Sequence, residues 1–178
     1  DEAVSDEAVV QFAEAEWRKH VEWACGDKDA ARLIQVLGRA SQLADAFVDN
    51  DVEDIGTTTE SRSGAMTELV LLLLNLDRNP FWAQNAASIR PVAVVSLLSW
   101  DATNQWAESP DEKTRMYAWA WREALDQTIV VVALLTGGLE WSRKVAQDVH
   151  AFYHARASEP FSEWDRKREG KWPTPAVA

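Results

Sequence analysis

The chain has 178 residues, of which 47% are hydrophobic and 26% charged, a mixture typical of one folded domain rather than a disordered chain. Its formal net charge is −11, and residues 1–63 carry most of it, with 15 acidic against 6 basic side chains. Because phosphate binding needs clustered Lys and Arg, this balance argues against nucleic acid as the main ligand. The single cysteine, Cys25, excludes an internal disulfide and a Cys-rich zinc site.

Nothing in the sequence predicts a membrane partner. The longest apolar runs, residues 69–74 and 129–135, are too short to span a bilayer. No cationic start followed by an apolar run marks a signal peptide. We therefore expect a cytoplasmic protein.

Hydrophobic periodicity predicts helices throughout the first half of the chain. Apolar residues spaced three and four apart indicate amphipathic helices over residues 4–24 and 30–50. The polar stretch at residues 51–63 contains a glycine and a threonine run and is predicted to be a loop. Residues 65–77 are apolar on nearly all sides, so we expect this helix to be central.

Two prolines mark helix boundaries in the middle of the chain. Asn79-Pro80 is predicted to end the helix before it, because the residue preceding a proline avoids helical geometry. The aromatic pair that follows is expected to fill the corner. Pro91 suits the first turn of a new helix that runs to about Trp106.

The stretch "SPDE" at residues 109–112 is the strongest local signal, with a capping serine, a proline suited to the first helical position and a glutamate that completes a capping box. A long helix is predicted from there to Thr136, where Gly137-Gly138 stops it, and a last helix covers about 139–156. The run "TIVVVALL" is rich in β-branched residues, but no strand-like run nearby could pair with it, so a helix is favoured.

Together these elements predict an all-α fold. Residues 1–157 are expected to form one bundle of five to six helices, and residues 158–178 an irregular, charged tail that contains Trp. Ten Trp residues are unusual in a chain of this length. Each brings a large apolar area and an N–H that needs a partner, so we expect some to anchor the core and others to lie at an interface.

Five carboxylates form a candidate metal site. They are Asp45, Asp49, Glu68, Asp101 and Asp126. The first two are four residues apart on one helix face, and each of the others extends an apolar stripe, where an acid is costly unless it is paired or metal-bound. Bundles build metal sites from inward acids on several helices, and Mg or Mn held in this way could activate water against a phosphate ester. The alternative is a basic or Trp partner for each carboxylate, such as Arg122 for Asp126.

Other patterns suggest Ca or Zn, which we favour less. Counting from Asp49, carboxylates fall at four ligand positions of a calcium loop, but Asp54 stands where that loop needs glycine. His150 and His154, four apart, could offer two imidazoles to zinc. The spacing between Arg143 and His150 resembles the Arg-x(4–6)-His pattern of small all-α ribonucleases, a pattern that is common by chance.

The sequence therefore favours a non-catalytic acidic protein that binds another macromolecule, and a protein with a basic surface is the partner we expect. Inhibitors, immunity-type proteins and accessory proteins of phages or mobile elements share this general character. The alternative is a metal-dependent hydrolase of a phosphate ester or nucleotide that uses the five carboxylates. A third hypothesis is a homo-oligomer in which a second copy covers exposed Trp patches.

Overall fold

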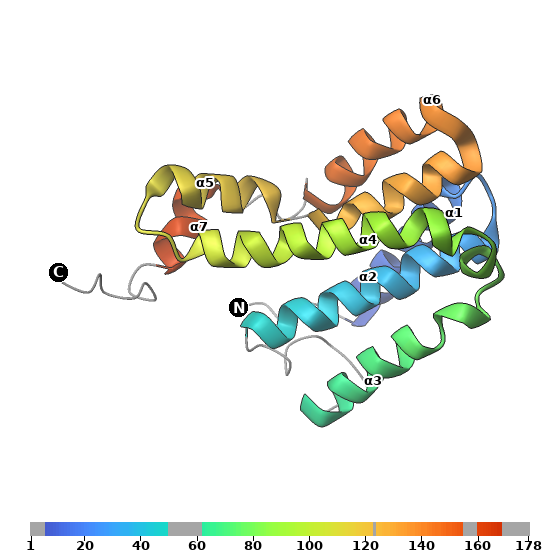
Figure 1. Ribbon diagram of the computed structural model, residues 1–178, viewed down its shortest axis with the longest axis horizontal. Coiled ribbons are helices and arrows are strands. Elements are labelled where there is room, and N and C mark those ends of the chain that lie inside the picture. The colour runs from blue at the N-terminus through green and yellow to red at the C-terminus, as the bar shows by residue number, and fades with distance from the viewer. Residues whose placement is uncertain (1–5, 50–61, 123, 155–159, 169–178) are drawn as a thin grey trace.

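The computed structural model describes residues 6–49, 62–122, 124–154 and 160–168, and all regular structure in these residues is helical (Figure 1). In chain order the elements are α1 (Asp6–Trp23), α2 (Lys28–Asp49), α3 (Arg62–Leu74), the short 3-10 helix η2 (Leu76–Arg78), α4 (Pro80–Ala107), α5 (Glu112–Trp121), the 3-10 helix η3 (Ala124–Asp126), α6 (Gln127–His154) and α7 (Phe161–Arg168). The predicted all-α class is confirmed, and seven α-helices slightly exceed the predicted five to six. None of the helices in the described ranges combines the length and apolarity needed to cross a bilayer.

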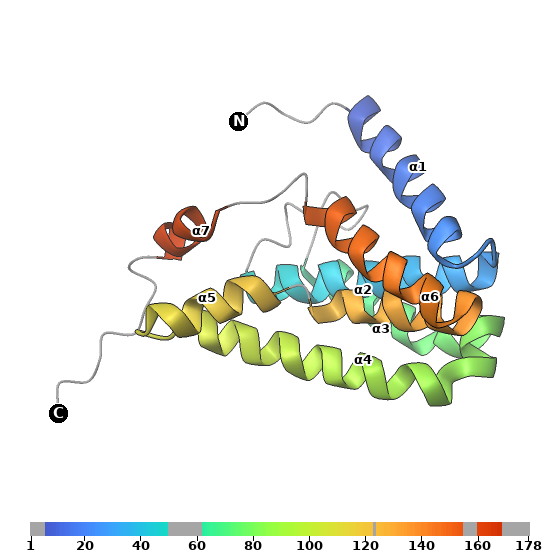
Figure 2. The same ribbon diagram turned by 90° about the horizontal axis from the view of Figure 1, so that it is seen from above.

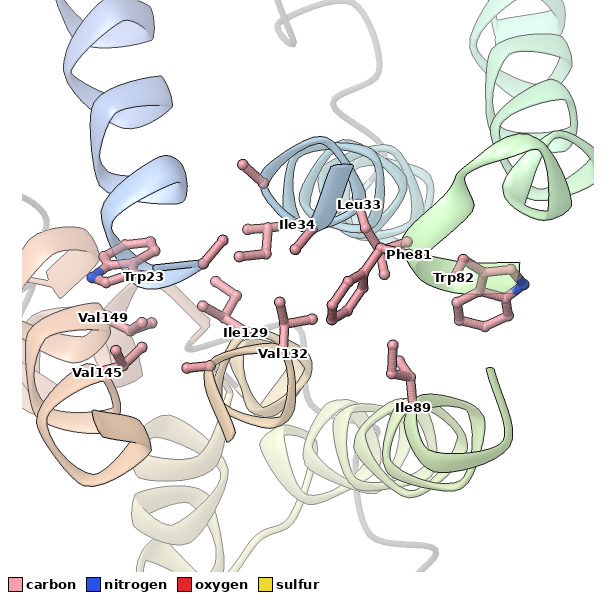
Figure 3. Packing of buried hydrophobic residues seen from close by; sticks show 14 residues of the cluster. Trp23, Leu33, Ile34, Phe81, Trp82, Ile89, Ile129, Val132, Val145 and Val149 are labelled. Carbon is pink, nitrogen blue, oxygen red and sulfur yellow. The ribbon is translucent and has the colours of Figure 1, made fainter. Parts of the chain in front are cut away.

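The main hydrophobic core lies where α1, α2, α4 and α6 meet (Figure 3). Its most deeply buried side chains come from all four helices and are Trp23, Leu33, Ile34, Ile89, Val132, Val145 and Val149. Trp82 is also buried, whereas Trp106 and Trp121 are exposed. The Trp residues thus divide between core and surface, as the sequence suggested. Burial of this apolar area is the main force that holds the four helices together.

The start of α4 differs from the prediction. Asn79 caps the helix, because its Oδ1 accepts a hydrogen bond of 2.9 Å from the backbone N–H of Trp82. Pro80 occupies the first helical position, where its missing N–H has no cost. Pro91, predicted to begin a helix, therefore lies inside α4 on an exposed face, where water can satisfy the carbonyl that it leaves free.

The long helix predicted from Pro110 to Thr136 is divided. α5 ends at Trp121, and α6 begins at Gln127 after the short η3. This break allows α5 to pack against α4 while α6 enters the core. The sequences before and after the break both favour a helix, and no single residue between them predicts an interruption. We therefore attribute the division to tertiary packing.

The cap of α5 also lies two residues later than predicted. Asp111, rather than Ser109, is the N-cap, and its Oδ2 accepts a hydrogen bond of 2.9 Å from the backbone N–H of Thr114. The Ser109 hydroxyl instead accepts one from the N–H of Asp111. The "SPDE" signal therefore marked the correct place but the wrong capping residue.

α6 folds back on itself at the glycine pair. Gly138 has φ 78° and ψ −175°, a conformation that glycine adopts far more readily than other residues. The two limbs of α6 lie antiparallel in Figure 1, and both contribute to the main core. The predicted break at Gly137-Gly138 is confirmed, and residues 129–135 are helical as expected.

α3 is not central, so that prediction was wrong. Only Ala65 is buried in this helix, which packs against the C-terminal half of α2 through Leu69 and Leu72. Figure 1 shows α3 beside α2 at the periphery, on the side of α2 away from α6. A helix that is apolar all round needs neighbours on several sides, and the described helices cover only one of them.

Part of the predicted irregular tail is helical. α7 docks on α5 and the end of α4, where Trp164 is buried against Ala107 and Ala118. Asp165 accepts hydrogen bonds of 2.6 and 3.0 Å from the guanidinium of Arg115, a bidentate ion pair that fixes the helix. The tail therefore contributes to the folded structure through residue 168 at least.

Candidate interaction surface

The largest unexplained feature of the described surface is the apolarity of α3. Five of its large hydrophobic side chains are between 44% and 73% exposed, namely Met66, Val70, Leu71, Leu73 and Leu74. Isolated exposed hydrophobics are normal, but several on one short helix make that helix a candidate interaction site. Packing within the described residues does not account for this composition, since the single buried residue of α3 is Ala65.

One ion pair fixes the position of α3 against α2. The guanidinium of Arg39 donates two hydrogen bonds, of 2.8 and 3.2 Å, to the carboxylate of Glu68. These bonds hold the pKa of Glu68 below its usual value, although partial burial opposes them. Leu43 and Ala46 of α2 also pack with Ala65 of α3 in a small hydrophobic cluster. The two helices therefore form a defined unit rather than a loose pair.

A groove of about 600 Å³ runs between α2, α3 and η2. Its apolar lining is Leu33, Val36, Leu71, Leu72 and Leu76, and its polar lining is Ser63, Thr67, Glu68, Asn75 and Asn79. The volume falls within the range of about 300–1,000 Å³ that is typical of binding pockets. The groove follows most of the length of α3, so it could accommodate an extended or helical segment.

The polar groups of the groove already bond within the protein. Asn79 donates to the carbonyl of Asp29 (2.8 Å), and Asn75 donates to the carbonyl of Leu71 (2.6 Å). The Thr67 hydroxyl donates to the carbonyl of Ser63 (2.8 Å). Because these donors are occupied, the groove offers mainly apolar contacts, and an apolar side chain is the kind of group that fits it best.

The five carboxylates predicted to bind a metal have separate surroundings. The exposed carboxylate of Asp45 accepts a hydrogen bond of 3.1 Å from the indole N–H of Trp100, and Glu68 is engaged by Arg39. The structure therefore places a Trp or Arg partner beside each of these two acids, as the alternative interpretation expected.

The remaining candidates add no ligand cluster. Asp101 is exposed and accepts a hydrogen bond of 3.1 Å from Gln105, and Asp126 is half-buried at η3. The side chain of Asp49 and the rest of the predicted calcium loop, residues 50–60, lie outside the described residues. Within the described ranges no three His, Cys, Asp or Glu side chains gather closely enough to hold a metal ion. The carboxylate site stays a prediction without structural support.

The described residues give no support to the zinc and ribonuclease-like patterns. His150 is exposed, and the side chain of His154 is outside the described set. Arg143, the residue of the ribonuclease-like spacing, donates a hydrogen bond to Glu140 on its own helix. These contacts are those of ordinary surface residues.

A buried polar network around His20 was not predicted from the sequence. The Tyr153 hydroxyl donates to Glu16 (2.9 Å), so His20 Nε2 must donate to Tyr153 (2.9 Å), and its Nδ1 has no hydrogen-bond partner among the described residues. Burial lowers the pKa of His20 to about 4. Burial first, and then the Glu16 carboxylate, raise the pKa of Tyr153 above its usual value.

A second pair of contacts adjoins this network. The buried indole of Trp23 donates a hydrogen bond of 2.7 Å to Asp148, which also accepts one of 2.9 Å from Lys19. Burial acts to raise the pKa of Asp148, but these two hydrogen bonds outweigh it and the pKa is lowered. The spacing of Glu16 and His20 on one helix face was the only sequence signal of this region. The partners on α6 are more than 120 residues away and could not be anticipated.

Comparison with family models, curated proteins and solved structures gives no match to this chain. What bears on function is therefore the chemistry of its own described surfaces. Those surfaces hold one large apolar groove, whereas the buried polar network is closed to solvent at His20.

Proposed function

We propose that the protein is non-catalytic and acts by binding another protein, whose apolar segment enters the groove between α2 and α3 and whose flanking residues are basic. The observation that carries this proposal is the exposure of α3. Its outer side chains remain in water in the chain alone, and a partner that covers them would remove a large apolar area from solvent.

The charge of the sequence that precedes α3 supports a basic partner. The segment that connects α2 to α3, residues 50–61, carries four acidic side chains and no basic ones. These are Asp51, Glu53, Asp54 and Glu60. Opposite charge at the rim of an apolar contact accelerates encounter and selects partners, while the apolar centre supplies most of the affinity.

Affinity capture with the full chain as bait, followed by titration of each captured protein, tests the proposal. We compare the wild type with Leu71→Glu, which places a charge in the groove on a side chain that is already 52% exposed. The variant should lose at least tenfold in affinity, because a carboxylate cannot be buried in an apolar contact without a partner. Added salt should weaken wild-type binding as it screens the acidic side chains of the first third of the chain.

Val10→Glu is the matched control, since Val10 is 58% exposed on α1 and does not line the groove. It should bind as the wild type does. Captured proteins that are acidic, or that bind Leu71→Glu equally well, would exclude the groove as the contact.

A further inference from the structure

The outer face of α4 carries a second apolar patch, separate from the α2–α3 groove. Val94, Val95, Leu97 and Leu98 are 50%, 63%, 49% and 62% exposed. The buried residues of α4, such as Ile89, lie on the opposite side of the helix, toward α2 and α6. Figure 2 shows α4 along the outer edge of the molecule, with no described helix beyond it. We call Pro91 and these four residues the α4 stripe.

The α4 stripe ends in opposite charges. Arg90 precedes it and Asp101 follows it, and both are exposed. Spacings of four and seven residues from Val94 place them on the same face as the stripe. Within the described part of the chain neither forms an ion pair: the Arg90 guanidinium lies over the Trp82 ring, 5.7 Å from its centroid, and Asp101 accepts only from Gln105.

We propose that the α4 stripe binds the same stripe of a second copy of this chain, with the two α4 helices antiparallel about a twofold axis near residues 95 and 96. In a contact of this symmetry, residue i meets residue j and residue j meets residue i. Such an axis brings Arg90 of each copy opposite Asp101 of the other and Val94 opposite Leu97. A parallel arrangement would instead place like charges together.

The local charge also favours a second copy over a basic partner at this face. From Arg62 to Ala107 the chain has three acidic and three basic residues, although its total charge is −11. The α4 stripe can therefore meet its own copy without the repulsion that the acidic N-terminal third would impose. Because the stripe is locally neutral, it offers a basic protein no electrostatic attraction.

The size of the patch sets the expected strength of this dimer. The stripe exposes on the order of 400 Å² of apolar surface, about half of the 800 Å² that one partner contributes to a standard interface. The charged and amide side chains at its ends add polar area. We therefore expect a weak dimer whose formation depends on protein concentration.

Sedimentation velocity of the full chain over a wide concentration range tests the proposal. Arg90→Glu or Asp101→Arg alone should weaken dimerisation about tenfold or more, since each creates two like-charge pairs. The double variant restores opposite charges across the axis and should regain most of the wild-type dimerisation. Misfolding could not produce this recovery, because the double variant carries both substitutions.

Two further variants separate the α4 stripe from α3. Leu98→Glu should abolish the dimer, whereas Leu74→Glu, at a position 73% exposed on α3, should leave it unchanged. Circular dichroism checks that each variant retains its helices. A monomer at every concentration, single charge reversals without effect, or a double variant that fails to recover would overturn the proposal. The groove variant Leu71→Glu probes the other surface, so the two proposals can fail independently.

Discussion

At the scale of single residues, the least expected feature is a neutral histidine inside the bundle. His20 is only 2% exposed, and its ring stacks at a tilt against Trp23 with centroids 5.7 Å apart. A charged imidazole would lose its hydration there without a hydrogen bond to an anion, since Tyr153 bonds to both His20 and Glu16 and the Glu16 carboxylate lies 3.9 Å from His20 Nε2. Folding therefore selects the neutral form.

This selection predicts a pH dependence of stability. The pKa of His20 is about 4 in the folded protein and near its usual 6.5 in the unfolded chain, so between these values only the unfolded chain binds the proton. The contribution of neutral His20 to the free energy of unfolding is complete above pH 6.5. It is lost as the pH falls toward 4, and the loss is at most about 3 kcal/mol. Urea denaturation of the wild type and His20→Gln at several pH values measures it.

Carboxylates with a lowered pKa, such as Asp148, also make the protein less stable in acid. The informative quantity is therefore the difference in the free energy of unfolding between the wild type and His20→Gln. That difference should shrink between pH 6.5 and 4. If it is constant across this range, the histidine is not held neutral by the fold.

At the scale of elements, glycines show where a helix must change direction and where it need not. A Cβ at Gly137 would lie 2.6 Å from Cys25 Sγ and would overlap the ring of Trp141. Gly138 has open space around it but a positive φ. Gly38, within α2, has neither constraint. The fold of α6 therefore depends on one glycine for space and on the next for conformation.

Alanine substitutions should separate these cases. Gly137→Ala should destabilise the protein by about 1–3 kcal/mol through overpacking. Gly138→Ala should cost about 1–3 kcal/mol through backbone strain. Gly38→Ala, the control, should stabilise by up to about 1 kcal/mol, since alanine is the better helix former. Chemical denaturation gives all three values; a neutral Gly138→Ala would contradict the sharp reversal of α6.

At the scale of the whole molecule, charge and apolarity are segregated. The acidic surplus belongs to the first third of the chain, whereas the exposed apolar side chains concentrate on α3 and the outer face of α4. The net charge favours dispersion of the chain in solution, and the two proposals above assign binding to its apolar faces.

Metal dependence distinguishes the two function classes. An ion that binds only the native state must raise the melting temperature. We expect no shift on treatment with EDTA or on addition of Mg, Mn, Ca or Zn, because no metal-binding cluster forms among the described residues. Scanning calorimetry measures this directly, and a rise with Mn or Mg would favour the alternative hypothesis of a metal-dependent hydrolase.

The sequence by itself determined the helical class, most helix ends and the uneven charge, because these depend on local periodicity, capping residues and composition. The break at Gly137-Gly138 was readable for the same reason. The start of α4 was not, since the rule that Asn79-Pro80 ends one helix also permits it to begin the next.

Only the tertiary structure decided which apolar faces are covered. The apolar composition of α3 predicts that the helix is buried, but it fits burial inside its own chain and burial against another chain equally well. The sequence could not distinguish these two alternatives. The same holds for Glu68 and Asp45, whose partners Arg39 and Trp100 come from other helices. A side chain's environment is set by elements distant in sequence, and their placement follows from the joint burial of all apolar stripes rather than from any one of them.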